Sequence, residues 1–179
     1  MQSTGGCSRP ERDYTAGGRP CQQPYRCGLH LYLCMQKLTV STRKKRQVLD
    51  ITDEVAKVLN SSYGDTSGVC QLSVLHTTAA VTTADLDPGT DLDMLDAFEH
   101  MIPKLQYRHP HNPAHVPDHI LSSVIGTSVA VPLNRGEMML GTWQRVVLVE
   151  LDGPRDRTLV LTVLAEQGGN FKTTKRGTR

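Results

Sequence analysis

Between residues 127 and 166, four short apolar segments alternate with turn sequences, and this pattern constrains the fold more than any other part of the chain. The segments are TSVAVPL, EMMLGTW, QRVVLVELD and RTLVLTVLAE, with NRG and DGPRD among the turns that join them. Consecutive strands joined by short turns pair antiparallel, so we predict an antiparallel meander. Val and Leu occupy both faces of RVVLVEL, which predicts a central strand that is covered on both sides.

Strands and short helices alternate in the preceding part of the chain. MQKLTVST has the period of a strand, and RQVLDIT is its predicted hairpin partner, with the basic run Arg43–Arg46 at the tip. GVCQLSVLH and AAVTTADL are two further predicted strands, and TDEVAKVLN, TDLDMLDAFEHMI and PDHILSSVI are predicted helices. The predicted fold class is therefore α+β, with a dominant antiparallel β-sheet folded as a sandwich-like core and two or three short helices.

The two ends of the chain differ in composition from the part between them. Residues 1–33 hold several Gly and Pro residues and no sustained apolar period, so we predict a disordered extension, with LHLYL as a short strand near its end. Residues 168–179 form a basic tail that contains no acid. Residues 34–167 are the predicted domain, and a chain that starts at Cys34 is expected to fold and to melt cooperatively.

Neither the cysteines nor the hydropathy pattern indicates export or a membrane span. The five cysteines are odd in number and form no C-x-x-C pair, and no secretory signal is visible, which together predict reduced thiols in a cytoplasmic protein. No apolar run approaches the ~20 residues that a membrane helix needs. Basic tails can touch nucleic acid, but a solvated end is the favoured interpretation. We expect a small-molecule substrate as partner, and neither nucleic acid nor a membrane.

Histidine is the residue type that most strongly suggests a site. Nucleotide-binding glycine loops, a G-x-S-x-G elbow and an H-E-x-x-H helix are all absent from the sequence. Four of the seven histidines lie within YRHPHNPAHVPDHI, namely His109, His111, His115 and His119. Prolines hold this segment extended, so it could present imidazoles to a metal or to a substrate. A solvated, histidine-rich loop is the alternative interpretation.

Two predicted strands add candidates to this group. His76 ends GVCQLSVLH on the same side as Cys70, Leu72 and Val74, which would place it at the mouth of the sheet, although a histidine bonded to a backbone carbonyl at the core edge is the alternative. Asp85 follows AAVTTA, where an acid could orient an imidazole, act as a base or cap a helix.

The segment from Gly141 to Arg155 supplies the remaining candidates. Trp143 is predicted to be buried and structural, so that Trp143→Ala should cost roughly 3–5 kcal/mol. Gln144 is a candidate substrate-binding amide nearer the pocket. Arg155, in DGPR, could hold a phosphate, although a charged turn residue explains that position equally well.

Three motifs together resemble the YjbQ-like family, the secondary thiamine-phosphate synthase enzymes. They are HTTAAVTTAD, YRH with the later PDHI and IGTSVAVPL, and LGTWQ followed by DGPR. The resemblance covers roughly residues 34–167 and implies a compact α+β homotrimer with a polar site at His76, His109 and His119. It also implies a divalent metal, usually taken to be zinc, at these histidines. The implied activity joins an aminopyrimidine diphosphate to a thiazole phosphate and releases pyrophosphate.

The chain departs from the family pattern at two places. Ala84 and Asp85 stand where relatives usually carry Asn-Glu, and Ala114 and His115 stand where they usually carry acids. Lost acids weaken a magnesium–diphosphate site, whereas His115 could be an additional ligand for zinc.

Two functions follow from these observations. The first is a metal-assisted enzyme that acts on a small phosphorylated or heterocyclic substrate, with His76, His109 and Asp85 as its candidate catalytic groups. The alternative is a non-catalytic small-molecule or metal-binding protein that has lost the acids of the family.

Overall fold

The computed structural model describes residues 31–110 and 112–166. The predictions for His111, for the basic tail and for residues 1–30 of the extension lie outside these ranges. The first strand begins at Leu31, so its first three residues belong to the segment predicted as an extension.

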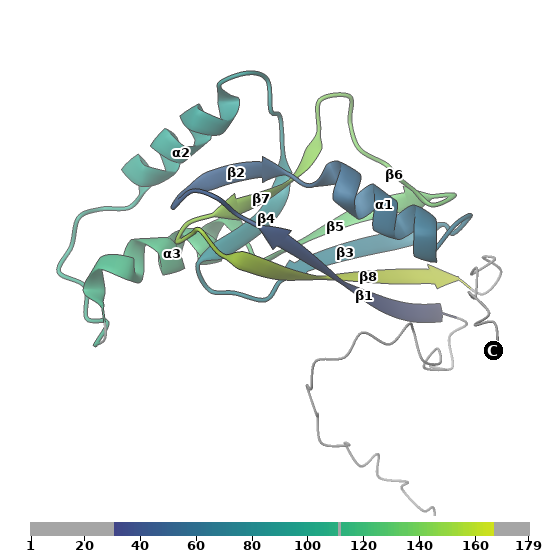
Figure 1. Ribbon diagram of the computed structural model, residues 1–179, viewed down its shortest axis with the longest axis horizontal. Helices are drawn as coiled ribbons and strands as arrows, with labels where there is room; N and C mark the ends of the chain where they lie inside the picture. Colours follow the sequence, from purple (N-terminus) through teal and green to yellow (C-terminus); the bar gives the residue numbers. More distant parts are fainter. Residues whose placement is uncertain (1–30, 111, 167–179) are drawn as a thin grey trace, which may run out of the picture.

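Eight strands of the described residues form two sheets (Figure 1). The five-stranded sheet has the order β1-β8-β3-β5-β6, and the three-stranded sheet has the order β2-β7-β4. Each pairing is antiparallel, so the predicted α+β fold with a dominant antiparallel sheet is confirmed. The strands are β1 (Leu31–Ser41), β2 (Gln47–Asp50), β3 (Gly68–Val74), β4 (Ala79–Ala84), β5 (Ser128–Asn134), β6 (Glu137–Met138), β7 (Arg145–Glu150) and β8 (Asp156–Glu166).

The predicted hairpin and the predicted meander are both wrong, although their strands exist. β1 pairs with β8 along its whole length, and β2 pairs with β7 in the other sheet. Arg43–Arg46 therefore lies in a turn that crosses from one sheet to the other. Of the last four strands, only β5 and β6 pair with each other, because β7 lies between β2 and β4, and β8 lies between β1 and β3. Local periodicity predicts a strand but does not encode a partner far away in the sequence.

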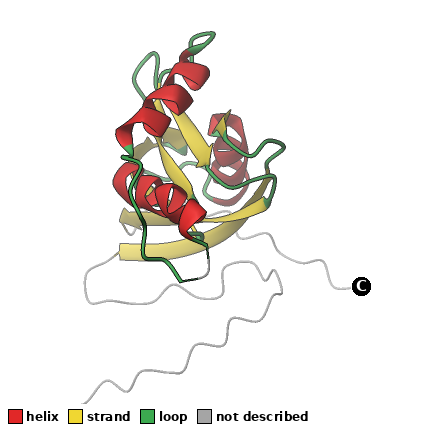
Figure 2. Ribbon diagram, turned by 90° about the vertical axis from the view of Figure 1, so that its left-hand side faces the viewer, coloured by secondary structure: helices red, strands yellow, loops and turns green. Residues whose placement is uncertain are grey.

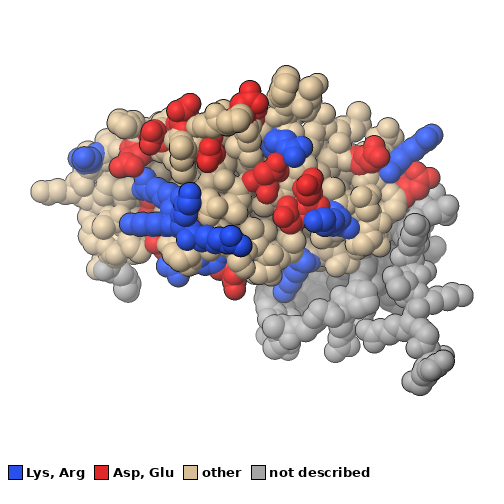
Figure 3. Space-filling model, turned by 45° about the horizontal axis from the view of Figure 1, so that its top comes forward, with Lys and Arg blue, Asp and Glu red and all other residues tan. Residues whose placement is uncertain are grey.

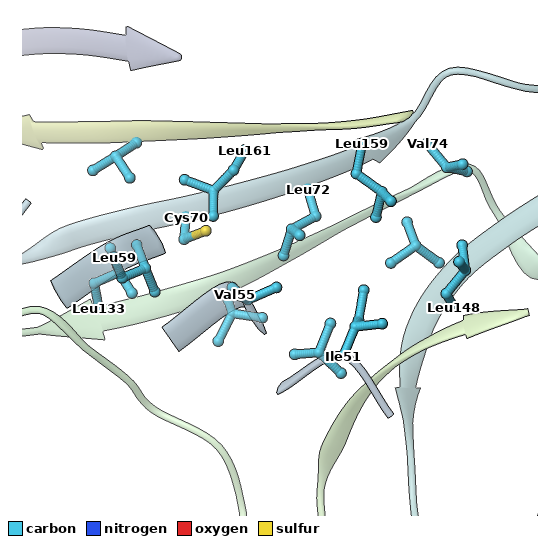
Figure 4. Close-up of a cluster of buried hydrophobic side chains, with 14 of the residues drawn as sticks. Ile51, Val55, Leu59, Cys70, Leu72, Val74, Leu133, Leu148, Leu159 and Leu161 are labelled. Carbon is cyan, nitrogen blue, oxygen red and sulfur yellow. The ribbon is translucent and has the colours of Figure 1, made fainter. Parts of the chain in front are cut away.

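β7 is the central, doubly covered strand that its sequence predicts. Its residues from Val146 to Glu150 are all buried. Val146 and Leu148 face the core between the two sheets, and Val147 and Val149 face a second core on the other side. Figure 4 shows part of the first core, where apolar side chains of both sheets and of helix α1 meet.

The three helices cover different parts of the sheets. α1 (Thr52–Ser62) buries Val55 and Leu59 in the core between the sheets, with Val58 packed beside them, as its apolar stripe predicts. α2 (Thr90–Met101) and α3 (Val116–Ile125) lie together at one end of the molecule (Figures 1 and 2). They pack on the outer face of the three-stranded sheet, so that β7 is enclosed from both sides.

The cysteines and the helices bear on the predicted location. Cys34 is disulfide-bonded, so the expectation of reduced thiols is wrong at this position. Cys70 is a buried free thiol, and burial raises its pKa to about 12. None of the helices in residues 31–110 and 112–166 has both the length and the apolar character to span a bilayer.

Candidate histidine pocket

His76 lies in the short loop that joins β3 to β4. Cys70, Leu72 and Val74 of β3 are buried, as the alternation predicts, but the strand ends at Val74 and the histidine two residues later is exposed. The backbone holds the start of this loop in place, because Val74 N–H donates to Thr127 O (2.9 Å) and Leu75 N–H donates to the carbonyl of residue 158 (2.9 Å).

The histidine-rich segment lies next to the loop that holds His76. A 3₁₀ turn, η1 (Pro113–His115), leads directly into α3, and the Asn112 side chain accepts a hydrogen bond from Ala114 N–H at its start. α3 is anchored on the sheet, because the Ser122 hydroxyl donates to the Ala79 carbonyl of β4 (2.7 Å). His119 therefore stands in the first turns of a helix whose position is set by a buried bond.

These two segments enclose an open pocket of about 590 Å³. It brings together three of the predicted site residues, His76, His109 and His119, as the sequence predicts. Sequence reasoning did not single out the other residues that line it: Thr77, Arg108, Val116, Ser122, Ser123 and Thr127.

A hydrogen bond to Nδ1 identifies the neutral tautomer of each of the three imidazoles. Thr78 N–H donates to His76 Nδ1 (3.2 Å), and Asn112 N–H donates to His109 Nδ1 (3.3 Å), so both neutral rings carry their proton on Nε2. The Thr77 carbonyl lies 3.0 Å from His119 Nδ1 and can only accept, so this ring carries its proton on Nδ1 and has a lone pair on Nε2. The pocket thus combines imidazole N–H donors with one imidazole base.

The two histidines from the Pro-rich segment are in contact. The rings of His109 and His119 are stacked, with centroids 5.6 Å apart and planes 23° from parallel. This contact joins the loop to α3 at the wall of the pocket.

The surroundings of His76 disfavour its protonated form. Burial lowers its pKa, and the positive charges of Arg157 and Arg155 lower it further, against an opposing effect of Glu150 and Asp152. His76 is therefore a neutral hydrogen-bond donor near neutral pH.

In the tautomers that these hydrogen bonds favour, His76 and His109 are not ready to bind a metal through Nε2. No group of three or more His, Cys, Asp or Glu side chains in the described parts of the chain could hold a metal ion. Coordination through Nε2 needs the ring proton on Nδ1, where it would oppose the N–H groups that donate to His76 and His109. Only His119 already has the required tautomer.

A buried ion pair lies behind His76. Arg157 of β8 is 1 % exposed and Glu150 of β7 is fully buried. Arg157 Nε donates to Glu150 Oε2 (2.7 Å), and Nη2 donates to Glu150 Oε1 and to the Thr78 hydroxyl (3.1 Å). These hydrogen bonds, with others from the Asp152 backbone and the Thr42 hydroxyl, hold the pKa of Glu150 below its ordinary value, although burial alone would raise it. A glutamate inside the otherwise apolar VVLVEL was the one signal of this pair in the sequence.

Asp85 and Gln144 do not reach the pocket within one chain. β4 runs from Ala79, beside the His76 loop, to Ala84, and Asp85 follows its far end. Five residues of strand span about 17 Å. Asp85 instead accepts from Asp87 N–H (3.1 Å), as in a local turn. Gln144 precedes β7 at this same far end, because Ala84 pairs with Arg145.

The prediction that Trp143 is buried is wrong. Its exposed fraction is 68 %. Gln144 Oε1 accepts from Gly141 N–H (2.8 Å), and Gln144 N–H donates to Gly141 O (3.0 Å), so residues 141–144 close into a tight turn. Gln144 thus has a structural contact, and the turn holds the indole outside both cores.

Arg155 lies in a turn beside the pocket and is held by Asp152. Its Nη2 donates to Asp152 Oδ2 (2.8 Å), and His115 Nδ1 lies 3.9 Å from the same oxygen, so neither residue lines the pocket. The β7–β8 turn binds the β1–β2 turn, because Gly153 N–H donates to Lys45 O (2.8 Å). Lys and Arg side chains gather at the left in Figure 3, the end at which these two turns lie in Figure 1.

Comparison with known proteins shows one family along the described domain. The family model "UPF0047 protein YjbQ-like" matches residues 36–166. A UPF0047 protein of Archaeoglobus fulgidus is 33% identical over 129 residues, which cover 72% of this chain and 99% of that protein. The UPF0047 protein YugU of Bacillus subtilis is 34% identical over 131 residues, which cover 73% of this chain and 98% of the relative.

Two solved structures are similar in both sequence and fold. A protein from Sulfolobus solfataricus, described as YbjQ-like and of unknown function, has a TM-score of 0.70 and 30% identity over 76% of this chain and 100% of its own. A hypothetical protein from Aeropyrum pernix has a TM-score of 0.66 and 36% identity, covering 74% of this chain and 98% of its own.

Proposed function

Because this chain belongs to the YjbQ-like UPF0047 family, we propose that its histidine pocket is an active site for a small phosphorylated or heterocyclic substrate. The observation that carries the proposal is the opposite tautomers of His76 and His119. One pocket thereby offers an N–H donor and an imidazole base, which general acid–base chemistry requires. The side chain of Arg108 adds a positive charge to the same wall.

The donors suit an anionic group on the substrate. A departing phosphate or diphosphate gains charge as its bond breaks, and N–H donors aimed at that charge lower the barrier. His76, with its proton on Nε2, and Arg108 are the groups that would bind it. His119 would remove a proton from a nucleophile, with the Thr77 carbonyl holding the ring in the required tautomer.

The specific reaction proposed is thiamine-phosphate synthesis, on the basis of the family resemblance. The ring nitrogen of the thiazole phosphate forms a bond to the methylene carbon of the aminopyrimidine, and the bond from that carbon to diphosphate breaks. This nucleophile carries no proton to be removed. Transfer therefore needs the donors but not the base, whereas hydrolysis of the same diphosphate by water needs both.

Pyrophosphate release, measured with and without the thiazole phosphate, tests this proposal. His76→Ala and Arg108→Ala should lower both reactions, and His119→Ala should lower only hydrolysis, by roughly 10²–10⁴-fold for loss of a general base. His100→Ala is the matched control, because this exposed histidine lies on α2 and bonds to its own helix at Asp96 O. Substrate binding by calorimetry without turnover would instead support a non-catalytic binding protein.

Three further predictions from the sequence belong to this proposal. Zinc binding at His76, His109 and His119 stays a prediction, and no step above depends on it. A homotrimer stays a prediction as well. A cytoplasmic location, with a small molecule as the partner, is the setting in which we propose that the enzyme works.

A further inference from the structure

A chain of polar contacts runs from the interior of the molecule to His76. Glu150 accepts from Arg157 through Nε and Nη2, and Arg157 Nη2 also donates to Thr78 Oγ1 (3.1 Å). Thr78 Oγ1 lies 3.0 Å from His76 Nδ1, and Thr78 N–H donates to the same nitrogen. Thr78 is 3 % exposed, so water does not compete for these contacts.

The donors in this series of polar contacts determine the direction of each hydrogen bond. A guanidinium has no acceptor, so the contact from Arg157 occupies a lone pair of the Thr78 hydroxyl. The hydroxyl hydrogen is then left to point at His76 Nδ1, where the Thr78 backbone N–H also points. Two donors on Nδ1 require it to be unprotonated, and the neutral ring must carry its proton on Nε2.

Stability alone is a poor explanation for the ion pair that begins this chain. Replacing a buried pair by well-packed apolar residues is often neutral or stabilising. In addition, Arg157 Nη1 is buried and has no hydrogen-bond partner among the described residues, so the guanidinium is not placed to satisfy its own donors. Its position is instead the one that lets Nη2 reach both Glu150 and Thr78.

We propose that Glu150, Arg157 and Thr78 are positioning residues that hold His76 as a hydrogen-bond donor, with its proton on Nε2. They act through one another and touch no substrate. The role of that donor, to bind the anionic group of a substrate, rests on the proposed function. The tautomer itself does not, so the two can be tested separately.

Nitrogen-15 NMR of histidine-labelled, metal-free protein at about pH 8, where an ordinary imidazole is neutral, reads the tautomer directly. His76 should show a protonated Nε2 and a bare Nδ1, assigned by loss of these signals in His76→Ala. His100, which bonds to a carbonyl through Nδ1, should show the opposite pattern and is an internal reference. A protonated Nδ1 on His76 in the unmodified protein would overturn the proposal without any variant.

A matched pair of substitutions tests the route through the hydroxyl. Thr78→Val keeps the shape of the side chain but removes the hydroxyl, and Thr78→Ser keeps the hydroxyl. Loss of one hydrogen bond should lower the ratio of the Nε2–H to the Nδ1–H form of His76 roughly three- to tenfold in the valine variant. The serine variant should resemble the unmodified protein. Equal ratios in the two variants would show that the hydroxyl does not position His76.

The result separates this inference from the proposed function. If the tautomer follows the prediction and no substrate is turned over, the positioning chain stands and the catalytic proposal fails. If pyrophosphate is released but His76 is protonated on Nδ1, the pocket is catalytic, but the positioning role of Thr78 and the proposed donor role of His76 both fail. Should Thr78→Val not fold, as judged by its melting curve, the spectra of the unmodified protein and of Thr78→Ser still decide the tautomer.

Discussion

At the scale of single residues, His119 differs from the other two pocket histidines in what it can offer. Its Nε2 lone pair is directed by a bond from Nδ1–H to the Thr77 carbonyl. His76 and His109 would each have to give up a backbone bond at Nδ1 before they could coordinate a metal through Nε2. The three predicted histidines line one pocket, but residue type and spacing carry no information on their tautomers.

Because of this difference, alanine substitutions of the three histidines should lower the predicted zinc binding to different extents. Elemental analysis of protein dialysed against zinc near pH 7 should show lower zinc content in all three alanine variants of the pocket histidines. His119→Ala should cause the largest loss, because the other two rings must rearrange to bind. Zinc should be released in acid, because metal binding needs unprotonated ligands. His100→Ala is the control, and equal small effects in all four variants would contradict a metal site.

At the scale of elements, β7 and β8 illustrate what the sequence could and could not predict. The double-sided apolar pattern of RVVLVEL correctly predicts a central strand, and the helical periods near Val55 and Phe98 correctly predict helices. The partners of the strands were not predictable locally, because β1 pairs with β8 across most of the chain. For the same reason the contact from Arg157 to Thr78, 79 positions away, left no pattern in the sequence.

The ion pair between these strands should make the stability of the protein depend on acid. The pKa of Glu150 is lowered in the folded protein, because hydrogen bonds from Arg157, Asp152 and Thr42 outweigh the effect of burial. Because the pKa of Glu150 is lower in the folded than in the unfolded chain, its ionisation stabilises the fold at pH values above the ordinary pKa of 4.5. This stabilisation is lost as the pH falls through the pKa of the folded protein. Urea unfolding should therefore show a steep loss of stability below about pH 4.5.

Glu150→Gln should change both the stability of the protein near neutral pH and the steepness with which stability falls in acid. The variant leaves Arg157 buried without a counter-charge, so we expect it to be about 3–5 kcal/mol less stable near pH 7. Its stability should fall less between neutral and acid pH than that of the unmodified protein. Glu137→Gln, the same change at an exposed position on β6, should alter neither. Parallel pH curves for Glu150→Gln and the unmodified protein would show that this carboxylate does not carry the acid dependence.

At the scale of the whole molecule, the feature that a single chain leaves unexplained is its exposed apolar surface. Trp143 is 68 % exposed and Met139, four residues earlier, is 60 % exposed, on either side of the tight turn at Gly141. Gln144 closes this turn, and Asp85 follows the same end of β4, which is remote from the histidine pocket. A lone, rigidly held tryptophan is the kind of side chain that anchors interfaces between proteins.

The homotrimer predicted from the family resemblance would account for this surface. A rotational trimer joins one surface of each copy to a different surface of the next, so Trp143 would pack against another part of a neighbouring copy. Light scattering across micromolar concentrations should give the mass of three chains. Trp143→Ala should shift the protein towards monomers, and it should leave the unfolding free energy of the isolated chain nearly unchanged, because the indole lies outside both cores. Met35→Ala, at a 55 % exposed residue on β1, tests whether any exposed apolar residue has the same effect. A clean monomer at all concentrations would contradict the trimer, and a loss of roughly 3–5 kcal/mol in monomeric Trp143→Ala would place the indole in the core after all.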